Sequence, residues 1–377
     1  MDNVVVLDYG SQTFKAGLAT NFPNAEEPRV VTPSAVELGS SGRGALDSVN
    51  DHAASASASQ DVVDRGVVTH WEGFESMCYD ILYRQLGWEQ GDEGSLLVAE
   101  PLFTSKADQE RLTQLFFEQF NVNALFLCDQ AVLSLYALGK TSGTVIDLGH
   151  GKVDIALVEE GRVHQPASRR LPFGGRDLTQ HLARLLHLGA GGAALLRAQV
   201  EALERAKIGC MRVLDSKEEL AAASAQEPGA YAPRFTLPDG RSVALAREGV
   251  ALGEALVDPS ALGLDLPPVA EAAFSAIMGH HDSAQRKAAL DSVLVCGGGS
   301  AAPGAPQRVL RDLRSLAPPS ITPAPVVLPE YMPPATPRHA AWMGGAVLSK
   351  VVFQGGHAIG KFDYDEIGPG VVHRKCC

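Results

Sequence analysis

The stretch from Thr144 to Gly161 constrains the fold of this chain more than any other part. It reads TVIDLGHGKVDIALVEEG, which is an apolar run that ends at an acid, a turn with two glycines, and a second run in which apolar residues alternate. Such alternation predicts a half-buried strand, and glycine takes the positive φ of a tight turn at little cost. The stretch therefore predicts a β-hairpin whose first strand ends at Asp147.

The N-terminus repeats this pattern. Residues 4–7 are apolar and run into Asp8, after which Gly10, Ser11 and Lys15 follow. Two hairpins, each with an acid at a strand end and a glycine soon after it, indicate an internal duplication. A single Asp-x-Gly turn would be an ordinary hairpin, whereas two copies with matched flanks favour a shared chemical role.

Phosphate binding is the role that this pair of hairpins predicts. Turn N–H groups form nests for phosphate oxygens, a lysine can reach phosphate as a point charge, and two carboxylates can hold the water ligands of a Mg²⁺ ion. The candidate binding residues are Asp8, Gly10, Ser11, Lys15, Asp147, Gly149 and Gly151, with Asp8 and Asp147 holding the metal through water.

Length and composition limit the class of protein. The chain has 377 residues, too many for one small core, so we expect two lobes or more. Its 45% hydrophobic and 20% charged residues are typical of a soluble globular protein, and we expect neither a membrane span nor a signal peptide. The six cysteines lack CxxC spacing, which favours reduced cytosolic or nuclear thiols. A net charge of -12 argues against direct nucleic-acid binding over a broad face.

Strand-like and helix-like segments alternate along the chain, as is typical of α/β proteins. We predict strands at 96–99, 125–127, 145–147, 153–157 and 293–295, and helices over 71–82, from Ser105, over 131–138, after 174–177 with Gly189 as a cap, and over 193–208. The glycines within 341–348 predict a closely packed helix, and the low-complexity residues 39–60 predict a mobile loop.

A set of motifs spread over nearly the whole chain resembles the actin family. They are Tyr364–Glu366 with Gly368 and Pro369, residues 372–376, Gln130–Ala137, Gly175–Thr179, Leu237–Gly240, and Trp342 with Gly344 and Gly345. The resemblance implies an α/β actin-like ATPase fold with two lobes, each with a duplicated mixed-sheet core, and a nucleotide in the cleft between them. Sugar kinases and chaperones share the two hairpins, but the C-terminal motif and Gly175–Thr179 favour the actin branch.

The same resemblance implies four subdomains. Subdomain 1 would comprise 1–33, 62–137 and 340–377, and subdomain 2 would be the short mobile segment 34–61. Subdomain 3 would comprise 138–173 and 265–339, and subdomain 4 would be 174–264. In actin the second subdomain makes longitudinal filament contacts through an apolar loop. Here the matching region consists mostly of Ser, Ala, Gly and Asp, so we expect no actin-like filament.

Within the family, LGWEQGDEGSLL at 86–97 and IDLGHGKVDIA at 146–156 most resemble the plant nuclear actin-related proteins of class seven. This likeness implies a nuclear protein, with a cytoplasmic pool left open, that is a structural subunit of a SWI/SNF-type chromatin-remodelling complex. Its implied partners are a helical segment of the remodelling ATPase and, as further candidates, another actin-related protein or actin. No direct nucleic-acid or membrane binding is expected.

Two departures from actin concern hydrolysis. Actin carries an aspartate where this chain has His150, and a histidine where it has Asp154, and both help to order the metal and the attacking water. Gln130 matches the glutamine that positions this water. An imidazole in place of an acid removes a negative charge and, if protonated, adds a positive one. The alternative is that His150 is only a polar turn residue.

Recognition of the nucleotide base is also altered. Gly297 and Gly298 match the double glycine of actin and Arg338 falls at its lysine near the base, but Ala302 stands where actin has an aromatic residue. ATP or ADP with Mg²⁺ is thus the implied cofactor. We expect a weakened or non-hydrolysing nucleotide site, and the alternatives are an active ATP-hydrolysing switch and a cytoskeletal actin.

The last expectation concerns a partner helix. In actin an apolar groove between the first and third subdomains receives amphipathic helices, and the matching residues Tyr136, Val347, Leu348 and Val351 remain apolar here. They predict helix-in-groove recognition. The alternative is that all four are ordinary core residues.

Overall fold

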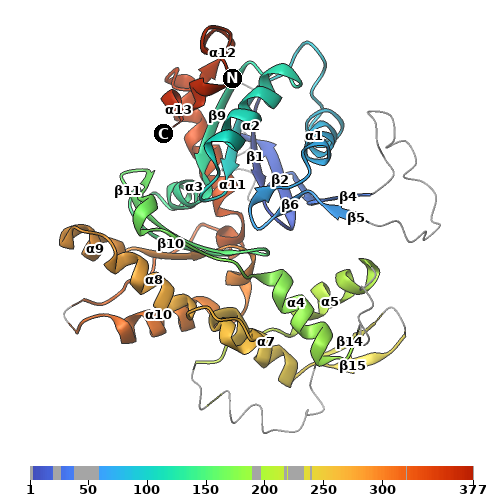
Figure 1. Ribbon diagram of the computed structural model, residues 1–377, viewed down its shortest axis with the longest axis vertical. Helices are drawn as coiled ribbons and strands as arrows, with labels where there is room; N and C mark the ends of the chain where they lie inside the picture. Colours follow the sequence, from blue (N-terminus) through green and yellow to red (C-terminus); the bar gives the residue numbers. More distant parts are fainter. Residues whose placement is uncertain are drawn as a thin grey trace. The chain divides into compact units, whose positions relative to one another are not determined.

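The computed structural model describes residues 3–19, 27–37, 59–188, 197–215, 219, 233–237, 240–319 and 321–376. The chain divides into two compact units (Figure 1). Unit 1 consists of Met1–Val145, Ala156–Pro166 and Val326–Cys377, and unit 2 consists of Ile146–Ile155 and Ala167–Pro325. Most of the predicted mobile loop, the predicted cap Gly189 and the centre of the Leu237–Gly240 turn lie outside the described residues. The four subdomain boundaries stay a prediction.

The core of unit 1 is a six-stranded mixed sheet. Its order is β17 (Ile359–Gly360), β9 (Ala124–Asp129), β8 (Ser95–Glu100), β1 (Val4–Tyr9), β2 (Thr13–Leu18) and β3 (Val30–Pro33). Strands β1, β8 and β9 run parallel, and β2 runs antiparallel to β1. The carboxyl ends of the three parallel strands therefore meet at one edge, where Asp8, Glu100 and Asp129 lie.

Two groups of helices cover the two faces of this sheet. Helices α1 (Trp71–Tyr79) and α2 (Lys106–Glu118) pack on the face that Val5 and Leu7 line, and α3 (Gln130–Ala137) and α11 (Thr336–Gln354) pack on the face of Val4 and Val6 (Figure 1). Successive strand side chains point to opposite faces. Strand β1 is therefore buried along its whole length, which fixes its register.

Most of the predicted elements of unit 1 are confirmed. Ser105 caps α2, because its hydroxyl accepts a hydrogen bond from the N–H of Asp108 at 3.0 Å. The helix predicted over 71–82 is different, since α1 ends at Tyr79 and continues as a π-helical turn, Asp80–Gln85. There the N–H of Leu86 donates to the carbonyl of Ile81, five residues back, at 2.9 Å. This wider turn precedes Trp88, whose indole is buried and donates to Asn3.

The second sheet has the order β12 (Arg162–Val163), β11 (Val153–Glu159), β10 (Gly143–Leu148) and β16 (Val293–Cys296), with β13 (Arg169–Leu171) paired to β11. Strands β10 and β11 are the predicted central hairpin. The helices of unit 2 are α4 (Gly175–Leu185), α5 (Arg197–Cys210), α7 (Arg247–Val257), α8 (Val269–Met278), α9 (Ser283–Leu290) and α10 (Ala305–Leu316).

Short elements complete the two units. They are the two-stranded ribbons β4 (Ala35–Glu37) with β5 (Ser59–Asp61), β6 (Val63–Asp64) with β7 (Val67–Val68), and β14 (Arg234–Thr236) with β15 (Ser242–Ala244), and the C-terminal helices α12 (Lys361–Ile367) and α13 (Val372–Lys375). Short 3₁₀ turns span Gln165–Ala167, Pro259–Leu262, Gly298–Ala301 and Pro369–Val371.

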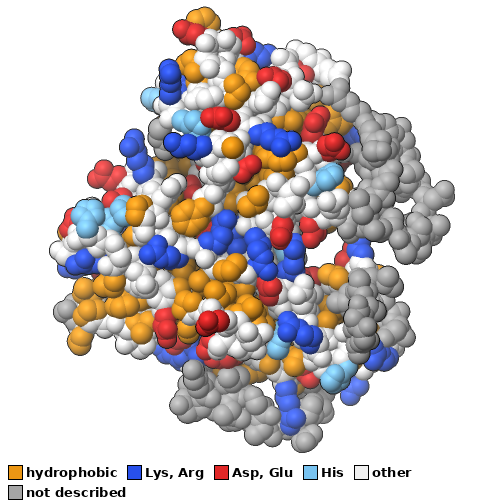
Figure 2. Space-filling model, viewed as in Figure 1, with side chains coloured by type: hydrophobic (Ala, Val, Ile, Leu, Met, Phe, Trp, Pro, Cys, Tyr) orange, Lys and Arg blue, Asp and Glu red, His pale blue; other side chains and the backbone are white. Residues whose placement is uncertain are grey.

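The surface is mixed in character. Figure 2 shows acidic and basic side chains interleaved with apolar ones on the face that it presents. Among the described residues, no helix has both the length and the apolarity that a membrane span requires.

Glycines let α3 and α11 approach closely, as the sequence predicts. A Cβ atom on Gly344 would overlap the carbonyl oxygen of Leu133 in α3, and one on Gly345 would lie 2.6 Å from a methyl group of Val6. The backbone of α11 is therefore in direct contact with the backbone of α3, and the site residues on these two helices depend on that contact.

We predict that Gly344→Ala lowers the free energy of unfolding of unit 1 by about 1–3 kcal/mol, because the added methyl group would overpack against backbone. The matched control is Gly370→Ala, whose Cβ would meet no atom within 4 Å. Urea unfolding followed by tryptophan fluorescence measures the effect, since Trp71, Trp88 and Trp342 all belong to unit 1. Equal midpoints for the two variants would contradict the prediction.

Candidate functional site

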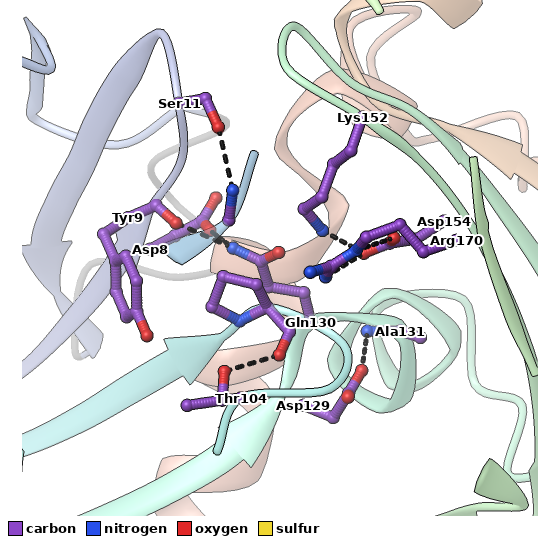
Figure 3. A network of polar contacts seen from close by, with 12 residues as sticks. Asp8, Tyr9, Ser11, Thr104, Asp129, Gln130, Ala131, Lys152, Asp154 and Arg170 are labelled. Atoms are coloured by element: carbon purple, nitrogen blue, oxygen red, sulfur yellow. Dashed lines mark hydrogen bonds and ion pairs between the residues drawn. The ribbon is translucent and has the colours of Figure 1, made fainter. Parts of the chain in front are cut away.

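The first hairpin brings three predicted residues together in unit 1. Asp8 is only 4% exposed and lies directly opposite Lys15 in the register of β1 and β2. The Lys15 Nζ atom donates to Asp8 Oδ2 at 3.0 Å. From the first turn of α3, Gln130 Nε2 donates to Asp8 Oδ1 at 2.7 Å and to the carbonyl of Tyr9 at 3.0 Å (Figure 3). Asp8 is thus held by one cation and one amide.

The turn of this hairpin uses some of its own polar groups. The N–H of Gly10 donates to the carbonyl of Thr13 at 3.0 Å, and the Ser34 hydroxyl donates to the carbonyl of Gly10. The Ser11 hydroxyl oxygen accepts from the N–H of Gly66 at 3.1 Å (Figure 3). Because the Gly10 N–H closes the turn, a phosphate bound here would be met by Lys15 and by other groups of the turn.

Arg338 contacts the candidate residue Lys15 through its backbone carbonyl. Lys15 Nζ donates to the carbonyl oxygen of Arg338 at 3.1 Å, at the N-terminal end of α11. The next residue, His339, is 5% exposed, and its Nδ1 atom has no hydrogen-bond partner among the described residues. Burial, with Lys15 and Arg338 nearby, lowers the pKa of His339 to about 4. This neutral imidazole directly follows the candidate residue Arg338, but nothing in the sequence pattern marks it as buried.

The second hairpin, in unit 2, closes in the same way. The N–H of Gly149 donates to the carbonyl of Lys152 at 3.0 Å, which repeats the bond between Gly10 and Thr13. The carbonyls of Gly149 and His150 then accept from the first two N–H groups of α4, those of Gly175 at 3.0 Å and Arg176 at 2.8 Å. The repeated turn bond supports the internal duplication, and the turn itself is fixed to the start of α4.

Asp147 lies against the glycine turn that follows β16. Gly297 has a φ of 83°, which favours glycine, and a Cβ atom there would overlap Asp147 Oδ1. A Cβ atom on Gly298 would meet nothing within 4 Å. The first of the two matched glycines is therefore required by the position of the Asp147 carboxylate. Asp147 belongs to unit 2, whereas Asp8 belongs to unit 1.

His150 is enclosed by its own unit. Its Nδ1 atom lies 4.0 Å from Glu204 Oε1 of α5, and the start of α4 packs against the ring. Burial lowers the pKa of His150 to about 4; the Glu204 carboxylate opposes this shift, and Lys207 and Arg176 add to it. The imidazole is therefore neutral at pH 7. It does not carry the positive charge that a protonated histidine would place at this position.

Lys207 completes this cluster and was not assigned a role from the sequence. It is 5% exposed, and burial lowers its pKa. Its Nζ atom donates to the carbonyl of Gly175 at 2.7 Å and to the Thr179 hydroxyl at 2.8 Å, and it pairs with Glu204 Oε2 at 2.7 Å. An ammonium group has three N–H donors. These three contacts therefore satisfy Lys207 within unit 2.

Asp154 forms an ion cluster with two cations of its own unit. It lies opposite Arg170 in the register of β11 and β13, and the guanidinium binds it through two bonds, Nε to Oδ1 at 2.7 Å and Nη2 to Oδ2 at 3.0 Å. Lys152 Nζ also pairs with Oδ2 (Figure 3). Two cations therefore hold both oxygens of the buried Asp154 carboxylate. We name Lys152, Asp154 and Arg170 the hairpin ion cluster.

The predicted partner residues lie on α3 and α11 of unit 1. Val351 is 62% exposed, whereas Tyr136, Val347 and Leu348 are half-buried. Tyr136 and Leu348 pack at the margin of the core between these helices, and the Tyr136 hydroxyl lies against Gly161. Their role in partner binding stays a prediction.

Comparison with known proteins identifies the family. The family model for actin matches residues 2–190 and 195–377. The chain belongs to the actin family. It is 39% identical over 376 residues to Actin-related protein 7 of Oryza sativa, subspecies indica and japonica, and 38% identical over 373 residues to Actin-related protein 7 of Arabidopsis thaliana. Each alignment covers 99% of both chains. The resemblance to the actin family and to the class-seven proteins is confirmed.

Proteins of the actin family usually bind a nucleotide with a divalent metal, and the residues of unit 1 fit such a ligand. Lys15 uses two of its three N–H donors on Asp8 and Arg338 and keeps one for a phosphate. The Asp8 carboxylate accepts one bond at each oxygen and retains lone pairs for metal-bound water. A bound Mg²⁺ would neutralise phosphate charge.

We predict that Asp154→His, which restores the actin residue, lowers the local unfolding free energy of β11 and β13 by about 3 kcal/mol. The substitution leaves Lys152 and Arg170 without their carboxylate, and breaking a buried pair typically costs about 3–5 kcal/mol. The partial exposure of Arg170, 20% for its side chain, places the effect at the low end. Hydrogen exchange followed by mass spectrometry measures it.

The control for this prediction is Glu201→Gln on α5. It removes an ion pair with Arg197 whose side chains are 54% and 42% exposed, and such surface pairs contribute at most about 1 kcal/mol. Unchanged exchange in Asp154→His would show that the hairpin ion cluster does not stabilise the sheet.

Proposed function

We propose that this chain is a non-filamentous nuclear actin-related protein. It serves as a structural subunit of a SWI/SNF-type chromatin-remodelling complex, and its nucleotide site hydrolyses ATP slowly or not at all. Its similarity to proteins named Actin-related protein 7 along the whole length supports the actin-related class. The nuclear and chromatin-remodelling role rests on the class-seven resemblance of 86–97 and 146–156.

The observation that carries the weakened-hydrolysis part is the position of Asp154. In actin the residue at this place helps to order the attacking water. Here both carboxylate oxygens bind cations of the same unit. Phosphoryl transfer depends on the positioning of the nucleophile and on stabilisation of charge. An acid already held by two cations is a poor substitute for an imidazole in that role.

His150 supports the same conclusion. An acid at this position would add a negative charge near the metal, whereas the half-buried imidazole is neutral at pH 7 and faces Glu204 and Lys207. The two residues that differ from actin, His150 and Asp154, therefore both contact charged side chains of unit 2. An active ATP-hydrolysing switch is the second candidate, and the arrangement of Asp8, Lys15 and Gln130 favours it.

We predict that phosphate release from Mg-ATP by the purified full chain is at least about 100-fold slower than by the variant His150→Asp, Lys152→Met, Asp154→His. Losing one well-placed electrostatic group typically costs about 100- to 1000-fold, and two losses in one network need not multiply. Lys152→Met is included because a histidine at position 154 would otherwise lie against two cations that bind the Asp154 carboxylate in the wild type.

Two controls make this comparison specific. Binding of a fluorescent ATP analogue is measured for both proteins, so that binding and hydrolysis are separated. Gln130→Ala is added to the triple variant and should abolish the gain, because the gain requires a positioned water. Wild-type turnover equal to that of the triple variant would refute the loss of hydrolysis.

Assembly is tested through the predicted partner residues. We predict that a remodelling ATPase co-purifies with the tagged chain from nuclear extract. We also predict that Val351→Asp weakens binding of the helical segment of that ATPase at least about tenfold. Val351 is 62% exposed, so an aspartate should not disturb the fold. The loss would come from placing a charge against an apolar helix face.

The matched control is Val327→Asp, since Val327 is 78% exposed and also belongs to unit 1. It should bind as the wild type does. Equal binding by all three proteins would exclude this surface. Recovery of cytoskeletal filaments without any remodelling ATPase would exclude the proposed assembly.

A further inference from the structure

Glu100 is a buried acid that the candidate site does not use. It is the last residue of β8, 8% exposed, and it lies on the same face of the sheet as Tyr9 of β1 and Asp129 of β9. Its Oε1 atom accepts a hydrogen bond from Gln109 Nε2 at 2.6 Å. Its Oε2 atom is buried and has no hydrogen-bond partner among the described residues.

A second buried glutamate in the same unit, Glu93, contrasts with Glu100 because donors surround its carboxylate. Glu93 is 6% exposed, and it accepts from the Tyr83 hydroxyl, the N–H of Gly91 and the Asn121 amide, each at 3.1 Å. Burial opposes the ionisation of Glu93, but these donors outweigh it and lower its pKa. Glu100 has one such donor. Burial and the adjacent Asp129 carboxylate raise the pKa of Glu100 to about 8.

Asp129 connects Glu100 to the candidate site. The two residues are neighbours in the parallel register of β8 and β9. Asp129 is also the N-cap of α3, because its Oδ1 atom accepts from the N–H of Ala131 at 2.7 Å (Figure 3). The helix that it caps begins with Gln130, whose amide holds Asp8. A contiguous set of contacts thus runs from Glu100 through the cap of α3 to Asp8.

We propose that Glu100 is a positioning residue that acts through Asp129. As a neutral acid it allows Asp129 to cap α3 and to keep Gln130 on Asp8. When Glu100 ionises, two like charges on neighbouring strands repel each other and the cap loosens. This inference does not depend on the proposed function, because it concerns the geometry of Gln130 whether or not ATP is hydrolysed.

The surroundings of Glu100 offer no compensation for its charge. Asp129 lies beside it on β9 and Tyr9 on β1, and Asp108 near the start of α2 adds a further negative charge beside Tyr9. Cys128 also lies close to it, although this residue precedes Asp129 and so points to the opposite face of the sheet. Gln109 of α2 is its one hydrogen-bond donor, and no cation acts on it within the described part of the chain. An ionised Glu100 would therefore be a buried charge without a partner, which is costly.

The sign of the pH dependence follows from these groups. The ordinary pKa of the glutamate is 4.5 and its pKa in the folded protein is about 8. Between these values the folded state keeps a proton that the unfolded state releases, so stability falls as the pH rises. The dependence ends above about pH 8, where both states are ionised. One proton changes the unfolding equilibrium constant about tenfold per pH unit.

The first experiment compares the full wild-type chain with Glu100→Gln by urea unfolding between pH 5.5 and 9. Tryptophan fluorescence reports unit 1, which holds both Glu100 and all three tryptophans. Relative to Glu100→Gln, the wild-type unfolding constant should rise about tenfold per pH unit up to about pH 7.5 and level off above about pH 8. Glu93→Gln, the matched control, should differ from the wild type by a constant factor over this range.

The second experiment separates positioning from a merely structural role. Hydrogen exchange is measured at the first turn of α3, corrected for intrinsic base catalysis, at pH 6.5 and pH 8.5. Wild-type protection at Ala131 should fall at least about tenfold more than in Glu100→Gln, because the ionised acid weakens the cap. Equal protection in the two proteins would overturn the positioning role.

Asp129→Asn provides a second variant should Glu100→Gln fail to fold. Asparagine retains the capping oxygen and removes the neighbouring charge. The pH above which the unfolding constant stops rising should then lie below pH 8, since one of the two causes that raise the pKa of Glu100 is gone. Parallel profiles for the wild type and both variants would overturn the proposal.

Discussion

The cross-strand pairing of Asp8 with Lys15 is the interaction on which the candidate site of unit 1 depends. Strand β1 is buried on both faces, so a slip of one residue would exchange its two sets of core side chains. That register places Asp8 where Gln130 can reach it from α3. The position of α3 depends in turn on its close contact with the glycines of α11. The packing of the core therefore also determines the geometry of the site residues Asp8 and Gln130.

The two duplicated hairpins share a turn but differ in their chemistry. In unit 1 the acid at the strand end binds one lysine and one amide, which leaves capacity for a ligand. In unit 2 the turn is hydrogen-bonded to α4, His150 is half-buried beside Glu204, and Asp154 is held by two cations. The same backbone pattern thus presents a ligand-competent side chain in one copy and an internally satisfied cluster in the other.

The features that the sequence predicted correctly all depend on short-range patterns. Alternating apolar residues and glycine turns predicted both hairpins, and the Ser105 cap predicted the start of α2. The hairpin ion cluster could not be found in this way, because the pairing of β11 with β13 brings Arg170 to Asp154 across 16 positions of sequence. The buried state of His339, Lys207 and Glu100 likewise depends on packing between elements that are distant in sequence.

The buried charges of unit 2 also bear on how a nucleotide site could lose its chemistry. A buried ion pair adds little net stability, yet removing one partner is costly because the other charge stays buried. Because Asp154 pairs with both Lys152 and Arg170, a single change at position 154 removes a carboxylate that two cations share. A histidine at position 154, as actin has, therefore carries a cost in stability unless the two cations change as well.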